Sequence, residues 1–257
     1  MAAATLVGGF DISSSLISGL AVAALKTRLA AQTHVSCDVK SKSAAADLLV
    51  GGHVGPVTVK GRGWRSRLGL SCRAIEATVE RCELDIGKVV SKRKLRLTKP
   101  AEGKAMIALN AEDFGNFVTH PLVKPPPVHE DDDGVASPIE FRRDGASIDP
   151  AAGTVTFLAK YMGQDWECTL KRGAKAQRRA VIVVRPVAAL SEDDIDATTS
   201  MRLTESLTKF FNNMVFELDG VFLNFRDMMV TSSSSVPTVM LSLNLVVHKF
   251  PSTKAAF

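Results

Sequence analysis

The chain has 257 residues, of which 46% are hydrophobic and 23% charged, and its formal net charge is +5. This balance is typical of a globular protein and excludes a largely disordered chain, and the length allows one large domain or two small ones. The charge is uneven, since residues 1–185 hold 27 Lys and Arg against 19 Asp and Glu, whereas residues 186–257 hold five against eight. Residues 60–104 alone hold 13 against five, which fits an anionic partner such as phospholipid or nucleic acid.

The first half of the chain predicts three helices and four strands. Residues 13–29 are rich in Ala and Leu and place Leu16, Leu20 and Ala24 one turn apart, as in a helix. The 14 uncharged residues between Asp11 and Lys26 are fewer than the roughly 20 that span a bilayer, and the segment lacks the Arg-rich composition of a transit peptide. Strands are predicted at residues 33–40, 54–62, 68–84 and 105–109, and short helices at 43–50 and 110–118.

Two of these strands have a clear apolar face. In residues 54–62, Val57 and Val59 lie on one side. In residues 68–84, one side carries Ile75, Ala77 and Val79, and the other carries Glu76, Thr78 and Glu80. Such alternation predicts a sheet with one buried and one solvated face.

A loop rich in proline and acids, residues 123–137, divides the chain. Its run VKPPPVHEDDD joins three prolines to four acids and lacks the oxygen spacing of a calcium-binding EF-hand loop, which predicts a solvated loop. Strands are then predicted at residues 138–148, 154–161, 164–170 and 179–187, a helix at 201–214, and two strands after it.

The last helix and the last strand each carry an apolar stripe. The helical stripe consists of Leu203, Leu207, Phe210, Phe211 and Met214. The strand presents Val239, Leu241, Leu243, Leu245 and Val247 on one face. Together the elements predict an α+β fold over residues 1–257, with long antiparallel strands packed around a few helices.

The sequence contains no recognisable signature of an enzyme or a metal site. Gly61, Gly63 and Ser66 approach the dinucleotide-binding pattern GxGxxG, but Ser replaces the third glycine. There is no GxSxG or HExxH motif, and the five histidines fall in separate elements. Cys37, Cys72, Cys82 and Cys168 form no CxxC pair, so dispersed reduced thiols are expected. We therefore expect no catalytic residue, no metal and no cofactor.

The basic stretch KRKLRL fits three alternatives: a nucleic-acid or nuclear-import patch, a membrane-surface patch, or one face of an ordinary solvated strand. As a strand, it would point Lys94 and Arg96 to one side and Leu95 and Leu97 to the other. Nucleic-acid sites usually add aromatic side chains for stacking, and residues 60–104 contain one aromatic residue, Trp64. The nucleic-acid alternative is therefore disfavoured, and the other two stay open.

The order of several segments resembles the LmeA-like phospholipid-binding family of bacteria, plants and algae. The segments are AADLLVGGHVGPVTVKGRGW, IEATVERCELDIGKVVSKRKLRLTKPAEGKAMIALNAEDFGNFV and LTESLTKFFNNMVFELDGVFLNFRDMMV, followed by HKFP. The matching positions are Gly55, Val57, Val59, Leu95, Arg96, Leu97, Pro100, residues 105–109, Asn110, Glu112, Asp113, Phe114 and Asn116. Two features depart from the family pattern. The glycine that usually stands just before the KLRL-type segment is displaced, since the nearest one, Gly87, lies seven residues ahead of Lys94. The acidic loop looks like an insertion.

The resemblance implies a single domain of the tubular lipid-binding type, in which a long curved antiparallel sheet wraps around helices and leaves an apolar channel. It implies a non-enzymatic, peripheral membrane protein that binds phospholipid and carries or senses it. Photosynthetic members look plastid-targeted, which implies a chloroplast location at a membrane. None of these properties follows from composition or periodicity.

Two sets of residues are predicted to act in such a protein. Docking on an anionic membrane surface is assigned to Lys92, Arg93, Lys94 and Arg96. The lipid-binding lining is assigned to Leu16, Leu20, Leu203, Leu207, Phe210, Phe211 and Met214. The alternative function is a structural or assembly factor that uses the same apolar surface to bind a protein partner, and a lipid hydrolase is a weaker third hypothesis.

Overall fold

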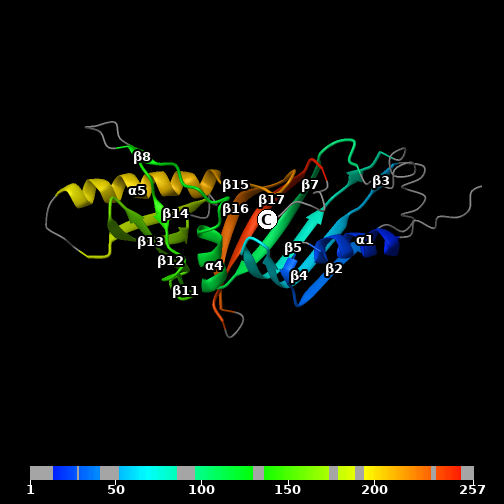
Figure 1. Ribbon diagram of the computed structural model, residues 1–257, viewed down its shortest axis with the longest axis horizontal. Helices are drawn as coiled ribbons and strands as arrows, with labels where there is room; N and C mark the ends of the chain where they lie inside the picture. Colours follow the sequence, from blue (N-terminus) through cyan, green and yellow to red (C-terminus); the bar gives the residue numbers. More distant parts are fainter. Residues whose placement is uncertain are drawn as a thin grey trace, which may run out of the picture.

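The computed structural model describes residues 14–27, 29–40, 52–85, 96–129, 136–173, 179–188, 194–232 and 236–249. Two antiparallel sheets lie side by side along the longest axis of the molecule (Figure 1). The larger sheet has eight strands and curls strongly into a half-barrel, and the smaller one has five strands. The α+β class and the curved antiparallel sheet are thus confirmed.

The larger sheet combines strands from both ends of the described chain. Its order is β1-β4-β5-β7-β17-β16-β15, and β2 also pairs with β4. The strands are β1 (Leu29–Ala31), β2 (His34–Val39), β4 (Val57–Ser66), β5 (Ser71–Val79), β7 (Ala101–Leu109), β15 (Val215–Glu217), β16 (Val221–Thr231) and β17 (Thr238–Val247). Strand β17 lies between β7 and β16, so the sheet brings together strands that are far apart in the sequence.

The smaller sheet has the order β10-β12-β13-β14, with β11 also on β12. Its strands are β10 (Glu140–Phe141), β11 (Ser147–Asp149), β12 (Thr154–Tyr161), β13 (Gln164–Arg172) and β14 (Ala180–Pro186). Two short pairs join β3 (His53–Val54) to β6 (Cys82–Glu83) and β8 (Val128–His129) to β9 (Ala136–Ser137). The helices are α1 (Ser14–Lys26), α4 (Ala111–Val118) and α5 (Asp194–Asn213).

The larger sheet has one apolar and one polar face, because residues paired across antiparallel strands point to the same side. Three apolar rows cross it in register. From β2 outward they are Val39, Val57, Val79, Gly103, Leu245, Leu223 and Phe216; Cys37, Val59, Ala77, Ala105, Leu243 and Phe225; and Val35, Gly61, Ile75, Ile107, Leu241 and Met228. The intervening rows on the other face are mostly polar, with hydrogen-bonded or charged pairs such as Thr58 with Thr78 and Lys60 with Glu76. This division gives the half-barrel an apolar interior.

The curl of the larger sheet brings backbones unusually close at Gly103. A Cβ atom at this position would lie 2.2 Å from the carbonyl oxygen of Thr78 and 2.9 Å from the Cα atom of Val79 on the neighbouring strand. Any side chain larger than hydrogen would therefore push β5 away from β7. Glycine at this point allows the sheet to bend without losing its pairing.

Helix α5 covers the free edge of the smaller sheet with a ladder of polar side chains. The N–H groups of Ala180, Ile182 and Val184 on β14 donate to Asn212 Oδ1, Thr208 Oγ1 and Thr204 Oγ1 at 2.9, 3.0 and 3.0 Å. Because these side chains are four residues apart on the helix, they meet every second residue of the strand. The ladder satisfies an edge that would otherwise be open to pairing with another chain.

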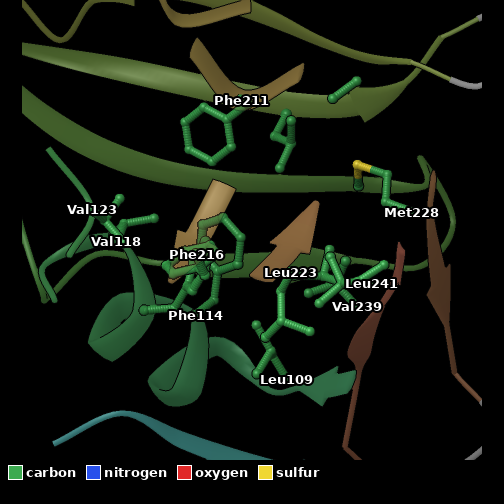
Figure 2. Packing of buried hydrophobic residues seen from close by; sticks show 14 of the residues in the cluster. Leu109, Phe114, Val118, Val123, Phe211, Phe216, Leu223, Met228, Val239 and Leu241 are labelled. Atoms are coloured by element: carbon green, nitrogen blue, oxygen red, sulfur yellow. The ribbon is translucent and has the colours of Figure 1, made fainter. Parts of the chain in front are cut away.

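Seven of the twelve phenylalanines join the two sheets through a chain of ring contacts. The rings belong to Phe114, Phe117, Phe141, Phe157, Phe210, Phe211 and Phe216, with neighbouring centroids 5.2–6.4 Å apart. Figure 2 shows Phe114 and Phe216 in the interior, with Phe211 of α5 across from them. Such pairs contribute about 0.5–1.5 kcal/mol each beyond the area that they bury. Helix α4, which carries two of the rings, therefore acts as the bridge between the sheets.

The structure corrects three of the predicted elements. The strand predicted at residues 68–84 is two strands, β5 and β6, and the strand predicted at 138–148 is interrupted between β10 and β11, where Gly145 has φ +85°. The last helix begins at Asp194, seven residues before the predicted start. The second-half strands form a separate sheet instead of extending one long sheet around the helices. The short helix predicted at 43–50 lies outside the described residues.

Replacing Thr208 by Val tests the polar ladder, because Val keeps the shape of Thr and removes its hydroxyl group. The buried N–H of Ile182 then loses its acceptor, and we expect the free energy of unfolding to fall by about 1–3 kcal/mol in chemical denaturation. Met201→Ala, on an exposed part of the same helix, serves as the control and should change it by less than about 0.5 kcal/mol. Equal effects of the two changes would mean that the ladder does not stabilise the fold.

Gly103→Ala tests the close approach of β5 and β7. We expect a loss of about 1–3 kcal/mol or more in the free energy of unfolding, since the new methyl group overlaps the Thr78 carbonyl. The matched change Gly19→Ala adds a methyl group to α1 where no atom lies within 4 Å, and it should stabilise the helix by about 0.5–1 kcal/mol. A neutral Gly103→Ala variant would contradict this account of the curl.

Candidate functional site

An apolar cavity of about 140 Å³ lies inside the half-barrel. Every strand of the larger sheet except β2 contributes to its wall, together with Phe117 of α4. The lining residues are Leu29, Trp64, Ser66, Leu70, Ser71, Cys72, Ile75, Ile107, Leu109, Phe117, Met214, Phe216, Leu218, Leu223, Phe225, Leu241 and Leu243. Strands β1 and β15 stand at opposite ends of the strand order, yet both line the cavity. The cavity therefore forms because the whole sheet curls.

The cavity has a buried floor and a half-exposed rim. The floor includes Leu109, Phe216, Leu223, Leu241 and Leu243, which are at least nine-tenths buried. The rim consists of half-buried apolar side chains, namely Leu29, Trp64, Leu70, Cys72, Ile75, Ile107, Met214, Leu218 and Phe225. An apolar cavity of about 150 Å³ accepts a ligand the size of benzene. This site therefore suits a short apolar segment that enters past the rim.

Trp64 forms part of the rim because Gly61 leaves room for its indole ring. A Cβ atom on Gly61 would lie within 1.9–2.3 Å of three ring atoms of Trp64. The indole N–H donates to the carbonyl oxygen of His34 on β2 at 3.0 Å, which fixes the ring across the strand. The stretch GRGWRS, which resembles a nucleotide-binding pattern in the sequence, is thus part of a strand that shapes an apolar wall.

A small polar cluster connects the cavity wall to α4. The Ser71 hydroxyl donates to Asp113 Oδ1 at 2.5 Å and accepts from Asn116 Nδ2 at 2.9 Å. Asp113 also belongs to the capping box of α4, since its N–H donates to Asn110 Oδ1 at 2.8 Å and its carboxylate accepts from the Asn110 N–H at 3.3 Å. The cluster holds α4, and with it Phe117, against the end of β5.

Cys72 lines the cavity beside this cluster. Burial, together with the negative charge of Asp113, raises the pKa of its thiol to about 12. The thiol is therefore neutral at physiological pH and contributes an apolar surface instead of a nucleophile.

The β4–β5 turn at the rim is rich in arginine. Arg65 pairs with Glu112 of α4 at 3.3 Å, and Arg67 donates to the carbonyl oxygen of Thr27, just beyond α1, at 2.9 Å. Leu68, between Arg67 and Gly69, is 50% exposed. Arg73 follows the lining residue Cys72 and is exposed. Cationic and apolar side chains thus share the surface next to the cavity.

A second, wider cleft of about 610 Å³ lies between α5 and the proline-rich segment. Its lining mixes charged, polar and apolar residues and consists of Pro126, Val128, Arg202, Glu205, Ser206, Lys209, Phe210 and Asn213. Because both charge signs occur within one helical face, this cleft has less apolar character than the cavity in the half-barrel.

The predicted lining residues occupy several different places. Leu203, Leu207 and Phe211 are fully buried against the smaller sheet and do not line the cavity. Phe210 lines the second cleft, between α5 and the proline-rich segment, and Met214 lines the apolar cavity. The side chains of Leu16 and Leu20 lie outside the described residues. Contact of this set with lipid stays a prediction.

The predicted docking residues lie mostly outside the described part of the chain. This applies to Lys92, Arg93 and Lys94, whereas Arg96 is described and exposed. Leu97, beside Arg96, is buried and bridges to Leu84. The expected alternation holds for the described residues 96–98, where Arg96 and Thr98 are exposed and Leu97 is buried. The docking role of Lys92, Arg93, Lys94 and Arg96 stays a prediction.

Sequence reasoning missed most of the cavity wall, although it identified several of its apolar faces. Ile75, Leu241 and Leu243 belong to faces that alternation predicted, yet they appeared as core residues of separate strands. Nothing in the sequence marked Trp64 and Phe216 as cavity-lining residues, because neither belongs to a long run of alternating apolar and polar residues. Their place follows from the curl, which brings β4 and β15 to one cavity.

No helix in the described part of the chain combines the length and hydropathy needed to cross a membrane. Among the same residues, no group of three or more His, Cys, Asp or Glu side chains is arranged to hold a metal ion.

The raised pKa of Cys72 predicts a slow reaction with thiol reagents. At pH 8 the native protein should show roughly a thousandfold slower alkylation of Cys72 by iodoacetamide than the protein in guanidinium chloride, because the thiolate is the reactive form. Peptide mapping by mass spectrometry after a short pulse measures each cysteine separately. Equal rates in the native and the unfolded protein would show that Cys72 is not buried at the cavity.

Comparison with known proteins gives one match. The model of the family described as LmeA-like phospholipid-binding matches residues 12–226, a range that runs from the region of α1 into β16. No curated protein and no solved structure matches the chain significantly. The range contains all of the cavity-lining residues except Leu241 and Leu243. The chain belongs to the LmeA-like phospholipid-binding family.

Proposed function

We propose that the protein is a non-enzymatic carrier or sensor of phospholipid that works at an anionic membrane surface and holds part of an acyl chain in the half-barrel cavity. Family membership supports phospholipid as the ligand. The observation that carries the proposal is the apolar cavity, to which seven strands of one sheet contribute. A continuous apolar wall with a half-exposed rim fits a hydrocarbon chain that enters from outside.

The size of the cavity limits what it holds. A space suited to benzene accepts about four CH₂ groups, which would contribute roughly 3 kcal/mol at about 0.8 kcal/mol each. The rest of the lipid then lies along the rim or in the bilayer. A lipid that is only partly withdrawn from the bilayer fits a protein that senses lipid or receives it at a membrane surface. To carry the lipid through water, the rim would have to close over more of the acyl chain.

The chemistry beside the cavity supports binding instead of turnover. The Ser71 hydroxyl donates a hydrogen bond to the Asp113 carboxylate, which already caps α4, and Cys72 stays neutral. No histidine is among the residues that line the cavity, so the cavity lining lacks the Ser–His pair of a typical serine hydrolase. The third hypothesis, a lipid hydrolase, therefore gains no support from the site.

Membrane association and a plastid location remain part of the proposal. Association is supported by the arginines around the β4–β5 turn, since each Lys or Arg near an anionic bilayer contributes about 1 kcal/mol. The chloroplast location rests on the family resemblance alone, and fractionation of cells that express a tagged full-length protein tests it directly.

Ile107→Trp fills the cavity and tests its role. Ile107 and Met106 are neighbours on β7 that point to opposite faces, so Met106→Trp is the matched control on the outer face. Native mass spectrometry and lipid extraction should show at least tenfold less bound phospholipid for Ile107→Trp and no change for Met106→Trp. Melting temperatures of both variants check that the fold is retained.

Two outcomes would count against the proposal. Equal lipid binding by both variants would show that the cavity does not hold the chain. A wild-type protein that purifies without phospholipid and ignores added lipid would remove lipid binding altogether. In that case the alternative, a structural or assembly factor that uses the same apolar surface to bind a protein partner, becomes the better explanation of the cavity.

A further inference from the structure

The β4–β5 turn is a fixed structure at the edge of the cavity. The N–H of Ser66 donates to the Leu70 carbonyl at 2.7 Å, and the N–H groups of Gly69 and Leu70 donate to the Ser66 carbonyl and hydroxyl at 3.2 and 3.0 Å. Gly69 has φ +92°, a conformation that glycine adopts without strain. Arg67 and Leu68 are therefore held at the tip of the turn in a defined position.

The apolar surface of the cavity continues to this tip. Trp64 lies on β4 before the turn and Leu70 lies in the turn just before β5; both line the rim, and Leu68 between them is half exposed. An exposed leucine at the tip of a rigid turn loses little conformational entropy when it is buried by a partner. The tip and the rim together form one apolar path into the cavity.

Cationic side chains surround the path. Residues 60–75 contain Lys60, Arg62, Arg65, Arg67 and Arg73 and no Asp or Glu. Arg65 shares its charge with Glu112, whereas Arg62 and Arg73 are exposed and make no ion pair with the described residues. The four arginines, Glu112 and Asp113 leave a net charge of +2 around the turn. This charge is held close to an apolar tip, as it is in proteins that dock on anionic lipid.

We propose that the β4–β5 turn docks on an anionic phospholipid bilayer, with Leu68 among the head groups and with Arg65, Arg67 and Arg73 on the lipid phosphates. In this orientation the rim of the cavity faces the bilayer, so an acyl chain reaches the buried floor at Leu241 and Leu243 without crossing water. This inference rests on the proposed function of the cavity and adds the surface and the direction of entry. It also places docking on a segment other than residues 92–96.

A bilayer fits this surface better than a nucleic acid does. The single aromatic residue in the stretch is Trp64, and its ring lies across Gly61 in the cavity wall, where it is not free to stack on a base. Nucleic-acid binding also gives no role to an exposed leucine at the tip. The combination of an apolar tip and a cationic surround is accounted for by lipid.

The test uses the full chain and vesicles of phosphatidylcholine with 30% phosphatidylserine at about 0.1 M salt. Leu68→Glu should weaken vesicle binding at least tenfold. The triple variant Arg65→Gln, Arg67→Gln and Arg73→Gln should weaken it about 100-fold and reduce its dependence on salt. Vesicles of phosphatidylcholine alone should bind the wild-type protein weakly.

Matched controls exist on the smaller sheet. Met162 is 57% exposed at the β12–β13 turn, so Met162→Glu places the same charge at another turn tip. Lys160→Gln, Lys171→Gln and Arg185→Gln together remove the same charge from β12, β13 and β14. Binding by both controls should stay within threefold of the wild type. Circular dichroism and melting temperatures establish that all four variants fold.

The outcomes separate docking from lipid binding in the cavity. A short-chain phospholipid below its micelle concentration should bind the wild type and Leu68→Glu equally, since it needs no bilayer. Docking by the turn is overturned if the controls lose vesicle binding as strongly as the test variants, or if no variant loses it. The cavity proposal is then tested separately, by the binding of the soluble short-chain phospholipid. If the soluble lipid binds to none of the proteins, the cavity proposal fails and the vesicle data still decide on docking.

Discussion

The fold depends on one constraint: three apolar rows must run in register across the strands of the larger sheet. Because side chains alternate between the faces of a strand, a shift of one residue at any pairing would send an entire strand's apolar set to the outer face. The rows cross from β2 to β16, and some of their inner positions are Gly or Ala, namely Gly61, Ala77, Gly103 and Ala105. At Gly103 the backbones of β5 and β7 approach too closely for a side chain, and this lets the sheet curl around its own apolar face.

The curl alone does not fill the interior, and the remaining space is the cavity. The phenylalanine chain and α4 close one side, and they tie the smaller sheet and α5 to the half-barrel. The rim of the cavity consists of half-buried apolar residues, and at the β4–β5 turn it is tied to α4 by the Arg65–Glu112 pair and the Ser71–Asp113 hydrogen bond. The hydrogen bonds of the polar ladder hold α5 at the edge of β14, outside the half-barrel. They thereby stabilise the arrangement in which the interior of the half-barrel is left partly unfilled. The binding space is thus a consequence of where the second sheet attaches.

Local patterns of the sequence were sufficient to predict which faces of helices and strands are apolar, but not which elements pack against those faces. The alternation in residues 239–247 correctly predicted a buried strand face, whereas the apolar face predicted in residues 75–79 is only half-buried. The capping residues around Asn110 lie where the short helix was expected. The stripe at Leu203, Leu207 and Phe211 was also correct as a buried face, yet it covers the smaller sheet and not the cavity. Periodicity reports that a face is buried and carries no information about what covers it. The pairing of β17 with β7, more than a hundred residues apart, depends on the register of the completed sheet.

The same alternation explains why the cavity has a cationic edge. Along the strands, polar residues point outward and apolar residues inward, so the two kinds are separated by the thickness of the sheet. At the β4–β5 turn the strands end and the separation ends with them. Arg67 and Leu68 are consecutive residues in the turn, and both are exposed. A turn next to the opening of an amphipathic half-barrel is therefore a place where charge and apolar surface meet, and this is the combination that a lipid surface recognises.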